Sequence, residues 1–207
     1  MTISYPLTFP TSFGLSGFTI GLDHAIAVAE SEFTFEAQVQ EHDGVAWEIS
    51  GYLELLTRDQ AADYNAFVKA LSGRKGTFYF SPPGSDAPRG IATGTPLVNG
   101  ADQTGQTLIT DGWTPGQTGI LKNDDYFQLG SGSSATLHSV VNGDVDSDGS
   151  GNATFDFAPK IVNAPTDNSA IVVTNPVGIF RMKENLLPVE IKPPFQHYIR
   201  FSARQAL

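Results

Sequence analysis

Residues 33–56 read FTFEAQVQEHDGVAWEISGYLELL, and two runs of alternating apolar and polar side chains lie within them. Such alternation is typical of a strand with one buried face. Between the runs lies Asp43-Gly44, a pair suited to the positive φ angles of a tight hairpin turn. We therefore predict two antiparallel strands joined at Asp43-Gly44. Their buried residues would be Phe33, Phe35, Ala37 and Val39 in the first strand and Trp47, Ile49, Leu53 and Leu55 in the second.

A helix is predicted directly after this hairpin, over residues 58–72. Thr57 can cap it, with Gln60 three residues on completing a capping box, and Gly73 ends it. The apolar residues recur at helical spacing: Ala61, Tyr64, Phe67, Val68 and Leu71. The next segment, GTFYFSPPG at 76–84, reads as a strand closed by two prolines.

The composition changes after residue 84. Residues 85–100 are rich in Gly, Pro, Ser, Thr and Ala, which indicates a connector. Residues 101–174 lack helical periodicity and contain short apolar segments between turns, a pattern typical of a small antiparallel barrel or sandwich. Strand patterns then resume in VGIFRMKE, VEIKPP and QHYIRFSA.

Charge divides the chain in the same way. Residues 1–92 hold eleven acidic and five basic side chains, residues 93–174 hold nine and two, and residues 175–207 hold two and five. The basic C-terminal strands would therefore complement the acidic first segment. We predict one domain made of 1–92 and 175–207, with 93–174 inserted into it as a second domain.

Composition excludes several classes of function. The net charge of −10 repels phosphate backbones and argues against a nucleic-acid reader. Because the sequence has no cysteine, disulfides, thiolate metal sites and thiol nucleophiles are excluded together. No secretory signal pattern and no apolar run of membrane-spanning length is present, so we expect a soluble protein made in the cytoplasm.

The segment DVDSDG at 144–149 matches the first half of a calcium loop. Asp144, Asp146 and Asp148 would be at its first, third and fifth positions and Gly149 at its sixth. The twelfth position should supply a bidentate Glu, but it is Phe155, and the flanking segments are strand-like. We interpret the segment as a solvated hairpin loop, with the three aspartates as weak calcium candidates only.

No other motif indicates catalysis or a cofactor. GSGSSA at 130–135 fits a dinucleotide-binding pattern but precedes a strand-like segment instead of a helix, so it is interpreted as a loop. No G-x-S-x-G elbow occurs. The four histidines lack the spacing of a helical metal pair: His24, His42, His138 and His197. We therefore expect no enzyme activity, no metal and no cofactor.

Several stretches in order resemble distal tail proteins of long-tailed bacteriophages. They are YPLTFPTSFGL (5–15), FTFEAQVQEHDGVAWEISGYL (33–53), TRDQAADYNAFVKALSGRKGTFYFSPPG (57–84), GILKNDDYFQLGSGSSATLHSVV (119–141), DVDSDGSGNATFDFAPKI (144–161) and VGIFRMKEN (177–185). The resemblance covers most of the chain and rests on short phrases, with no catalytic signature. Asn123 departs from it, since glycine is expected before the aspartate of that turn.

The resemblance implies a mainly β fold: a β-sandwich with one flanking α-helix, plus an inserted small antiparallel β-barrel of the OB-like type. It also implies a structural virion protein of the tail tip or baseplate hub. Such a protein assembles as a homo-oligomer, a hexameric ring between the tail tube protein and the tip proteins. DNA would pass through the ring without specific binding, and no membrane insertion is expected.

An alternative function is a carbohydrate-binding module. In that case the inserted barrel would bind glycan on the host surface through exposed aromatic rings, for which the candidates are Trp113, Tyr126 and Phe127. The sequence favours the tail component, and an enzyme ranks below both.

Overall fold

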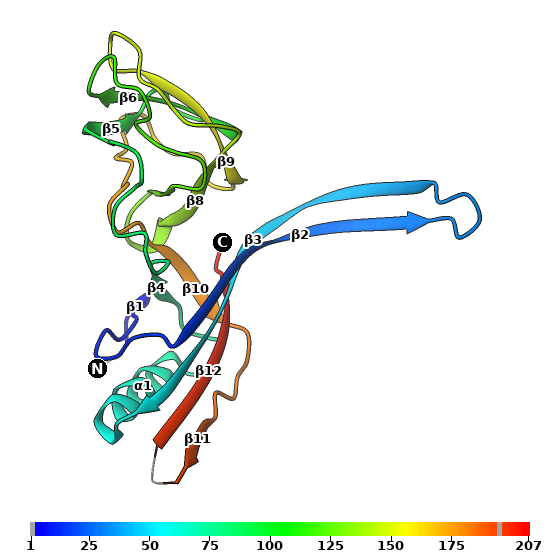
Figure 1. Cartoon of the computed structure of the whole chain (residues 1–207), viewed down its shortest axis with the longest axis vertical. Helices are drawn as coiled ribbons and strands as arrows, with labels where there is room; N and C mark the ends of the chain where they lie inside the picture. Colours follow the sequence, from blue (N-terminus) through cyan, green and yellow to red (C-terminus); the bar gives the residue numbers. More distant parts are fainter. Residues whose placement is uncertain (1–2, 194–195) are drawn as a thin grey trace.

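The chain folds into two curled sheets and one helix, shown in Figure 1 as a computed structural model. The structure describes residues 3–193 and 196–207. One sheet is mixed and has seven strands, and the other is antiparallel and has five; each curls into a half-barrel. The prediction of a mainly β fold with one α-helix is confirmed.

The seven-stranded sheet combines both ends of the chain. In spatial order it contains β1 (Leu7–Thr8), β4 (Phe78–Phe80), β10 (Gly178–Met182), β12 (Gln196–Gln205), β3 (Ala37–Leu56) and β2 (Gly17–Glu30), while β11 (Val189–Lys192) pairs with β12 outside this row. Among the strands of the described residues, β1 and β4 alone pair in parallel. The C-terminal strands β10 and β12 therefore lie between β4 and β3, and they join strands that are distant in the sequence.

The predicted hairpin turn at Asp43-Gly44 is wrong. β3 runs without a break from Ala37 through Gly44 to Leu56, and its antiparallel partner is β2, with the turn at 31–36. Phe33 and Phe35 consequently lie in the turn and are exposed. Local propensity favoured a turn at Asp43-Gly44, but the hydrogen bonds that β2 supplies outweigh it.

The Asp43-Gly44 pair instead lies in an irregular part of the ladder. His24 is opposite Val45, but Ile26 is opposite Glu41, so that Ala25 faces the extra residues of β3. Such a bulge bends the strand that carries it and increases its twist. The two strands bend away from the rest of the sheet beyond this region (Figure 1).

Helix α1 (Arg58–Leu71) covers the inner face of the seven-stranded sheet. The predicted capping box is present, because Thr57 Oγ1 accepts from the backbone N–H of Gln60 at 3.4 Å and the Gln60 side chain accepts from Thr57 N at 3.0 Å. Ser72 in the left-handed conformation ends the helix. Its buried face packs against the sheet through Ala61, Tyr64, Phe67 and Leu71.

The five-stranded sheet is formed entirely from the middle of the chain. In spatial order it contains β5 (Gly94–Val98), β6 (Gly105–Trp113), β9 (Ala153–Ile161), β8 (Thr136–Val141) and β7 (Tyr126–Leu129), with a 3-10 turn η1 (Gly132–Ser134) between β7 and β8. Fourteen buried residues form its own core, among them Leu108, Trp113, Phe127, Phe155 and Phe157.

The two sheets touch through a small apolar contact. The indole N–H of Trp47 on β3 donates to the carbonyl of Leu137 on β8 at 2.8 Å, and the ring of Tyr126 lies 5.7 Å from that of Trp47. The Leu137 side chain belongs to the core of the seven-stranded sheet. These contacts hold the five-stranded sheet against the base of the long β2–β3 pair.

Candidate functional site

The most exposed feature of the fold is a two-stranded arm, which we define as residues 24–45. The last pairing of β12 with β3 is Arg204 opposite Glu48, so β3 has only β2 beside it beyond that point. Residues 24–30 span roughly 20 Å at about 3.3 Å per residue. Figure 1 shows the arm projecting away from both sheets. A two-stranded ribbon of this kind is at best marginally stable in water without a partner.

The two faces of the arm differ in chemistry. Residues that pair across an antiparallel ladder share a face, so Val28 and Val39 lie together with Ile26. They are 60%, 63% and 48% exposed. The opposite face carries Ala27, Ala29, Gln38 and Gln40. At the tip, the side chains of Phe33 and Phe35 are 93% and 76% exposed. One face of the arm therefore has three exposed apolar side chains between Glu41, opposite Ile26, and Glu30, and the tip has two exposed aromatic rings.

The arm is also acidic. It contains five carboxylates and no lysine or arginine. Asp43, at its base, pairs with Lys160 of β9 at 2.6 Å, and this hydrogen bond lowers the pKa of Asp43. The other four take part in no ion pair within 3–193 and 196–207: Glu30, Glu32, Glu36 and Glu41. The outer part of the arm thus carries four uncompensated negative charges.

A basic hollow lies near the root of the arm, where β10, β12 and the turn after α1 meet. Its volume is about 240 Å³, and its lining includes Arg74, Arg181, Lys183, Arg204 and Gln205. Lys183 bonds to Glu48 at 2.6 Å, and Arg204 bonds to both Asp23 and Glu48. These contacts lower the pKa of Glu48, and the hydrogen bond from Lys183 has the largest effect.

Two of the cations in the hollow have no acidic partner. The Arg181 guanidinium donates to the backbone carbonyl of Arg74 at 3.2 Å, and neither arginine forms an ion pair in the described part of the chain. Arg181 also lies directly opposite Arg204 across the β10–β12 ladder. Arg74 is followed directly by Lys75 in the sequence, and the fold adds Arg181 to this basic pair.

The three aspartates of the DVDSDG segment each accept hydrogen bonds from different loop residues. Asp144 accepts from Asn123 N at 3.2 Å and Asp146 accepts from Gly119 N at 2.7 Å. Asp148 accepts from the backbone and side chain of Asn152, and these bonds with that of Ser150 N lower its pKa. Among the residues that the structure describes, no group of three or more potential ligands is placed to hold a metal.

The aromatic candidates for glycan binding are not exposed as expected. Trp113 is 3% exposed and Phe127 is fully buried, so the expectation of exposed rings is wrong for both. Both belong to the core of the five-stranded sheet because a curled half-barrel turns the apolar side of its strands inward. Tyr126 is half-buried against Trp47, and its pKa is raised by burial and by the charge of Asp124. The three rings therefore form no stacking surface.

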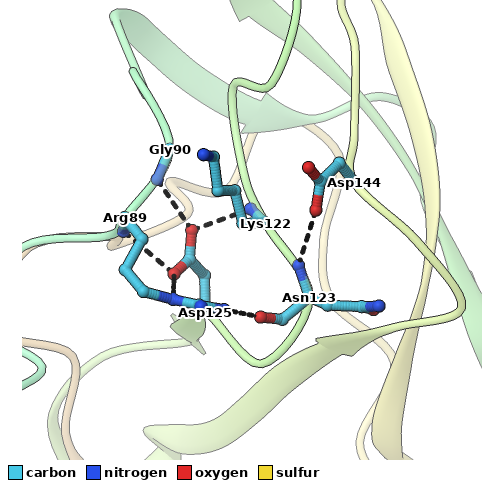
Figure 2. A network of polar contacts seen from close by, with 6 residues as sticks. All are labelled: Arg89, Gly90, Lys122, Asn123, Asp125 and Asp144. Carbon is cyan, nitrogen blue, oxygen red and sulfur yellow. Dashed lines mark hydrogen bonds and ion pairs between the residues drawn. The ribbon is translucent and has the colours of Figure 1, made fainter.

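A buried carboxylate attaches the connector to the five-stranded sheet. Figure 2 shows Asp125, 3% exposed, accepting from the backbone N–H groups of Arg89, Gly90 and Lys122 at 2.8–3.0 Å. The Arg89 guanidinium adds an ion pair at 3.3 Å and a bond to the carbonyl of Asn123. In this turn the positive φ falls on Asp124, so Asn123 needs none of the freedom of the expected glycine.

Sequence reasoning missed the arm because it left residues 17–30 unassigned. The signal was present: Phe18, Ile20 and Leu22 alternate with polar or small residues, and Ile26 and Val28 continue the same alternation, which His24 alone interrupts. A second signal is that no lysine or arginine occurs before Arg58, whereas eight acidic residues do. Electrostatic repulsion is lower when such an acidic segment lies away from the rest of an acidic molecule.

No model of a known protein family matches the sequence, and no curated protein matches it. None of the helices in the described part of the chain is long and apolar enough to cross a membrane.

Proposed function

We propose that this chain is a structural subunit of a phage tail, a distal tail component that assembles into a ring between the tail tube and the tip. The arm is the observation that supports the proposal most strongly. Exposed apolar side chains on a two-stranded ribbon are unfavourable in water, and burying them against another molecule contributes about 25 cal/mol per Å² of apolar surface. A subunit that carries such an arm is suited to bind a neighbouring subunit through it.

A contact between an arm and a different surface of the next subunit is heterologous. Repetition of such a contact closes into a ring when the rotation per subunit allows it. The resemblance to distal tail proteins leads us to propose six subunits. The net charge of −10 suits a passage for DNA, because tight binding of duplex DNA requires clustered Lys and Arg that release counterions.

The carbohydrate-binding alternative has no comparable support. Of its candidate rings, Trp113 and Phe127 are buried in the core of the five-stranded sheet, and Tyr126 is half-buried against Trp47 of β3. Glycan sites depend on accessible aromatic faces, which these side chains do not provide.

The test is to alter the apolar face of the arm and leave its fold unchanged. The variant Val28→Thr with Val39→Thr keeps β-branched shape but places hydroxyl groups on the face that we expect to be buried between subunits. The matched control, Gln38→Thr with Gln40→Thr, changes the opposite face. Sedimentation velocity and negative-stain imaging, alone and with the tail tube protein, should show rings for the parent and the control. The valine variant should associate at least ~10-fold more weakly.

Two results contradict the proposal. One is a parent protein that stays monomeric at high concentration and also beside its tail partners. The other is tight binding of duplex DNA at physiological salt, which a passive channel does not require. Both valines are exposed, so we expect the melting temperature of the monomer to be nearly unchanged in either variant.

A further inference from the structure

The arm of a subunit projects away from the basic hollow of the same subunit. The hollow lies near the arm root, where Arg204 pairs with Asp23 and Glu48, whereas Glu32 and Glu36 lie in the turn at the far end. Figure 1 shows the arm leaving the sheet in one direction without folding back. The carboxylates of the tip and the free arginines of the hollow therefore cannot meet within one chain.

Two arginines of the basic hollow, Arg74 and Arg181, have no anionic partner among the described residues. Arg181 and Arg204 are direct cross-strand neighbours, and like charges in that position destabilise a sheet. Glu48 and Asp23 compensate Arg204 and Lys183 but not Arg181 or Arg74. The side-chain amide nitrogen of Gln205, which also lines the hollow, is buried without a hydrogen-bond partner. An anion beside Arg181 and Arg74 would offset the repulsion.

We propose that the basic hollow of one subunit binds the carboxylates at the arm tip of a second subunit, in particular Glu32 and Glu36. The inference rests on the proposed function and names the surface on which the arm docks. Arginine is suited to this role, because its planar group binds carboxylates through two parallel hydrogen bonds. Within the residues that the structure describes, the arm has four carboxylates without an ion pair, and Arg74, Arg181 and the neighbouring Lys75 supply three cations without one.

A second copy fits the hollow better than a nucleic acid does. Three exposed cations are a small number for a phosphate backbone, and the nearby Lys183 and Arg204 are already paired with Glu48 and Asp23. The arm supplies carboxylates from an element with no cation of its own. It also has exposed apolar side chains that association would cover.

The first experiment uses cross-linking between copies. The natural chain contains no cysteine, so single cysteines give a clean reaction. We would mix Thr34→Cys, in the arm tip, with a tagged Lys75→Cys, beside the hollow, and add a short bis-maleimide. The control pair combines Thr34→Cys with Ser150→Cys, an exposed position in a loop of the five-stranded sheet region. We expect at least several-fold more adduct from the first pair; equal yields or no adduct overturn the inference.

The second experiment exchanges charges. Glu32→Lys with Glu36→Lys, and separately Arg74→Glu with Arg181→Glu, should each weaken self-association at least ~10-fold, measured by sedimentation at low salt. The four-site variant that combines them should recover most of the parental affinity, since opposite charges again face each other. Circular dichroism checks that each variant folds.

The outcomes separate this inference from the proposed function. If the parent forms rings and both charge-reversal variants form them equally well, the proposed function stands but the proposed docking surface is wrong. Absence of rings and of adducts overturns both. If Arg74→Glu with Arg181→Glu abolishes binding of a short DNA duplex and leaves self-association unchanged, the hollow binds nucleic acid and the inference is wrong.

Discussion

Single buried polar residues hold the five-stranded sheet together. His138 on β8 is stacked against Phe127, with ring centroids 5.4 Å apart, and lies edge-on to Phe157. Its Nδ1 bonds to the carbonyl of Pro159 at 2.8 Å and therefore carries a proton, while Nε2 accepts from the Thr136 hydroxyl at 2.9 Å. Both nitrogens of the neutral ring are satisfied, and burial lowers the pKa of His138 to about 4.

His138 makes stability depend on pH. Because the pKa falls from 6.5 in the unfolded chain to about 4 in the folded one, the unfolded state takes up a proton first as the pH falls. Stability from this group is complete above pH 6.5 and declines by about 1.4 kcal/mol per pH unit as the pH falls towards 4. Urea unfolding between pH 7 and 5 should show the slope.

A matched pair of variants checks that the slope belongs to this side chain. His138→Gln should remove most of it, whereas His42→Gln, at an exposed position, should retain it. A slope that survives in His138→Gln contradicts the assignment. Below pH 5 the carboxylates with lowered pKa values, Asp148 and Asp156 among them, add their own losses, so the comparison is restricted to higher pH.

Asp125 is the second residue whose removal should be costly. In Asp125→Asn, the new amide group cannot accept from the backbone N–H groups that one carboxylate oxygen now satisfies. We expect a loss of about 2 kcal/mol in the free energy of unfolding, measured in urea. The neighbouring change Asp124→Asn is the control, because asparagine tolerates the positive φ of that position and should cost little.

At the scale of elements, helix α1 depends on its first turn. Thr57→Ala removes the hydroxyl that accepts from Gln60 N, and we expect it to cost about 1 kcal/mol. Thr57→Ser keeps the hydroxyl and should be close to the parent. Thermal unfolding followed by circular dichroism distinguishes the two; similar losses in both would show that the cap contributes little.

The two ends of strand β3 differ in how they are stabilised: its inner part is packed within the seven-stranded sheet, and its outer part belongs to the exposed arm. The inner part of β3 lies between β12 and β2, with Ile49 and Leu53 fully buried. Beyond Glu48 the same strand pairs with β2 alone; Trp47 is still buried, but the residues from Gly44 to Ala37 are exposed. The bulge opposite Ala25 and the ion pair of Asp43 with Lys160 both lie at this boundary.

At the scale of the whole molecule, the order of strands predicts which fragments fold. Residues 93–174 have a core and five paired strands of their own, so this fragment should fold alone. Residues 1–92 lack β10 and β12, which join β4 to β3, and should be poorly soluble with unpaired strand edges. Circular dichroism and proton NMR of both fragments test this; autonomous folding of 1–92 would refute the insertion model.

Calcium should have little effect on the whole chain. The carboxylates of Asp144, Asp146 and Asp148 already accept backbone or side-chain hydrogen bonds at three separate places. A ligand that binds only the folded state raises its stability by mass action. Melting curves with excess calcium and with a chelator should therefore coincide, and a shift of several degrees would overturn the interpretation of this segment as a loop.

The sequence by itself determined the features that depend on neighbours in the chain. The capping box of Thr57 and Gln60 and the buried stripe of α1 require only contacts within a few residues and the spacing of apolar side chains. The same holds for the short alternating strands of residues 101–174, from which the mainly β class followed.

Tertiary structure alone decided where the hairpin turns and which residues are exposed. Asp43-Gly44 has the composition of a turn, yet β3 passes through it because β2 pairs with β3 on both sides of the bulge, from Ala37 to Glu41 and from Val45 to Tyr52. Trp113 and Phe127 are buried because the curl of their sheet turns those rings inward, and Arg74 meets Arg181 because β10 returns to the first sheet. These outcomes depend on pairings between distant segments, which local sequence patterns do not encode.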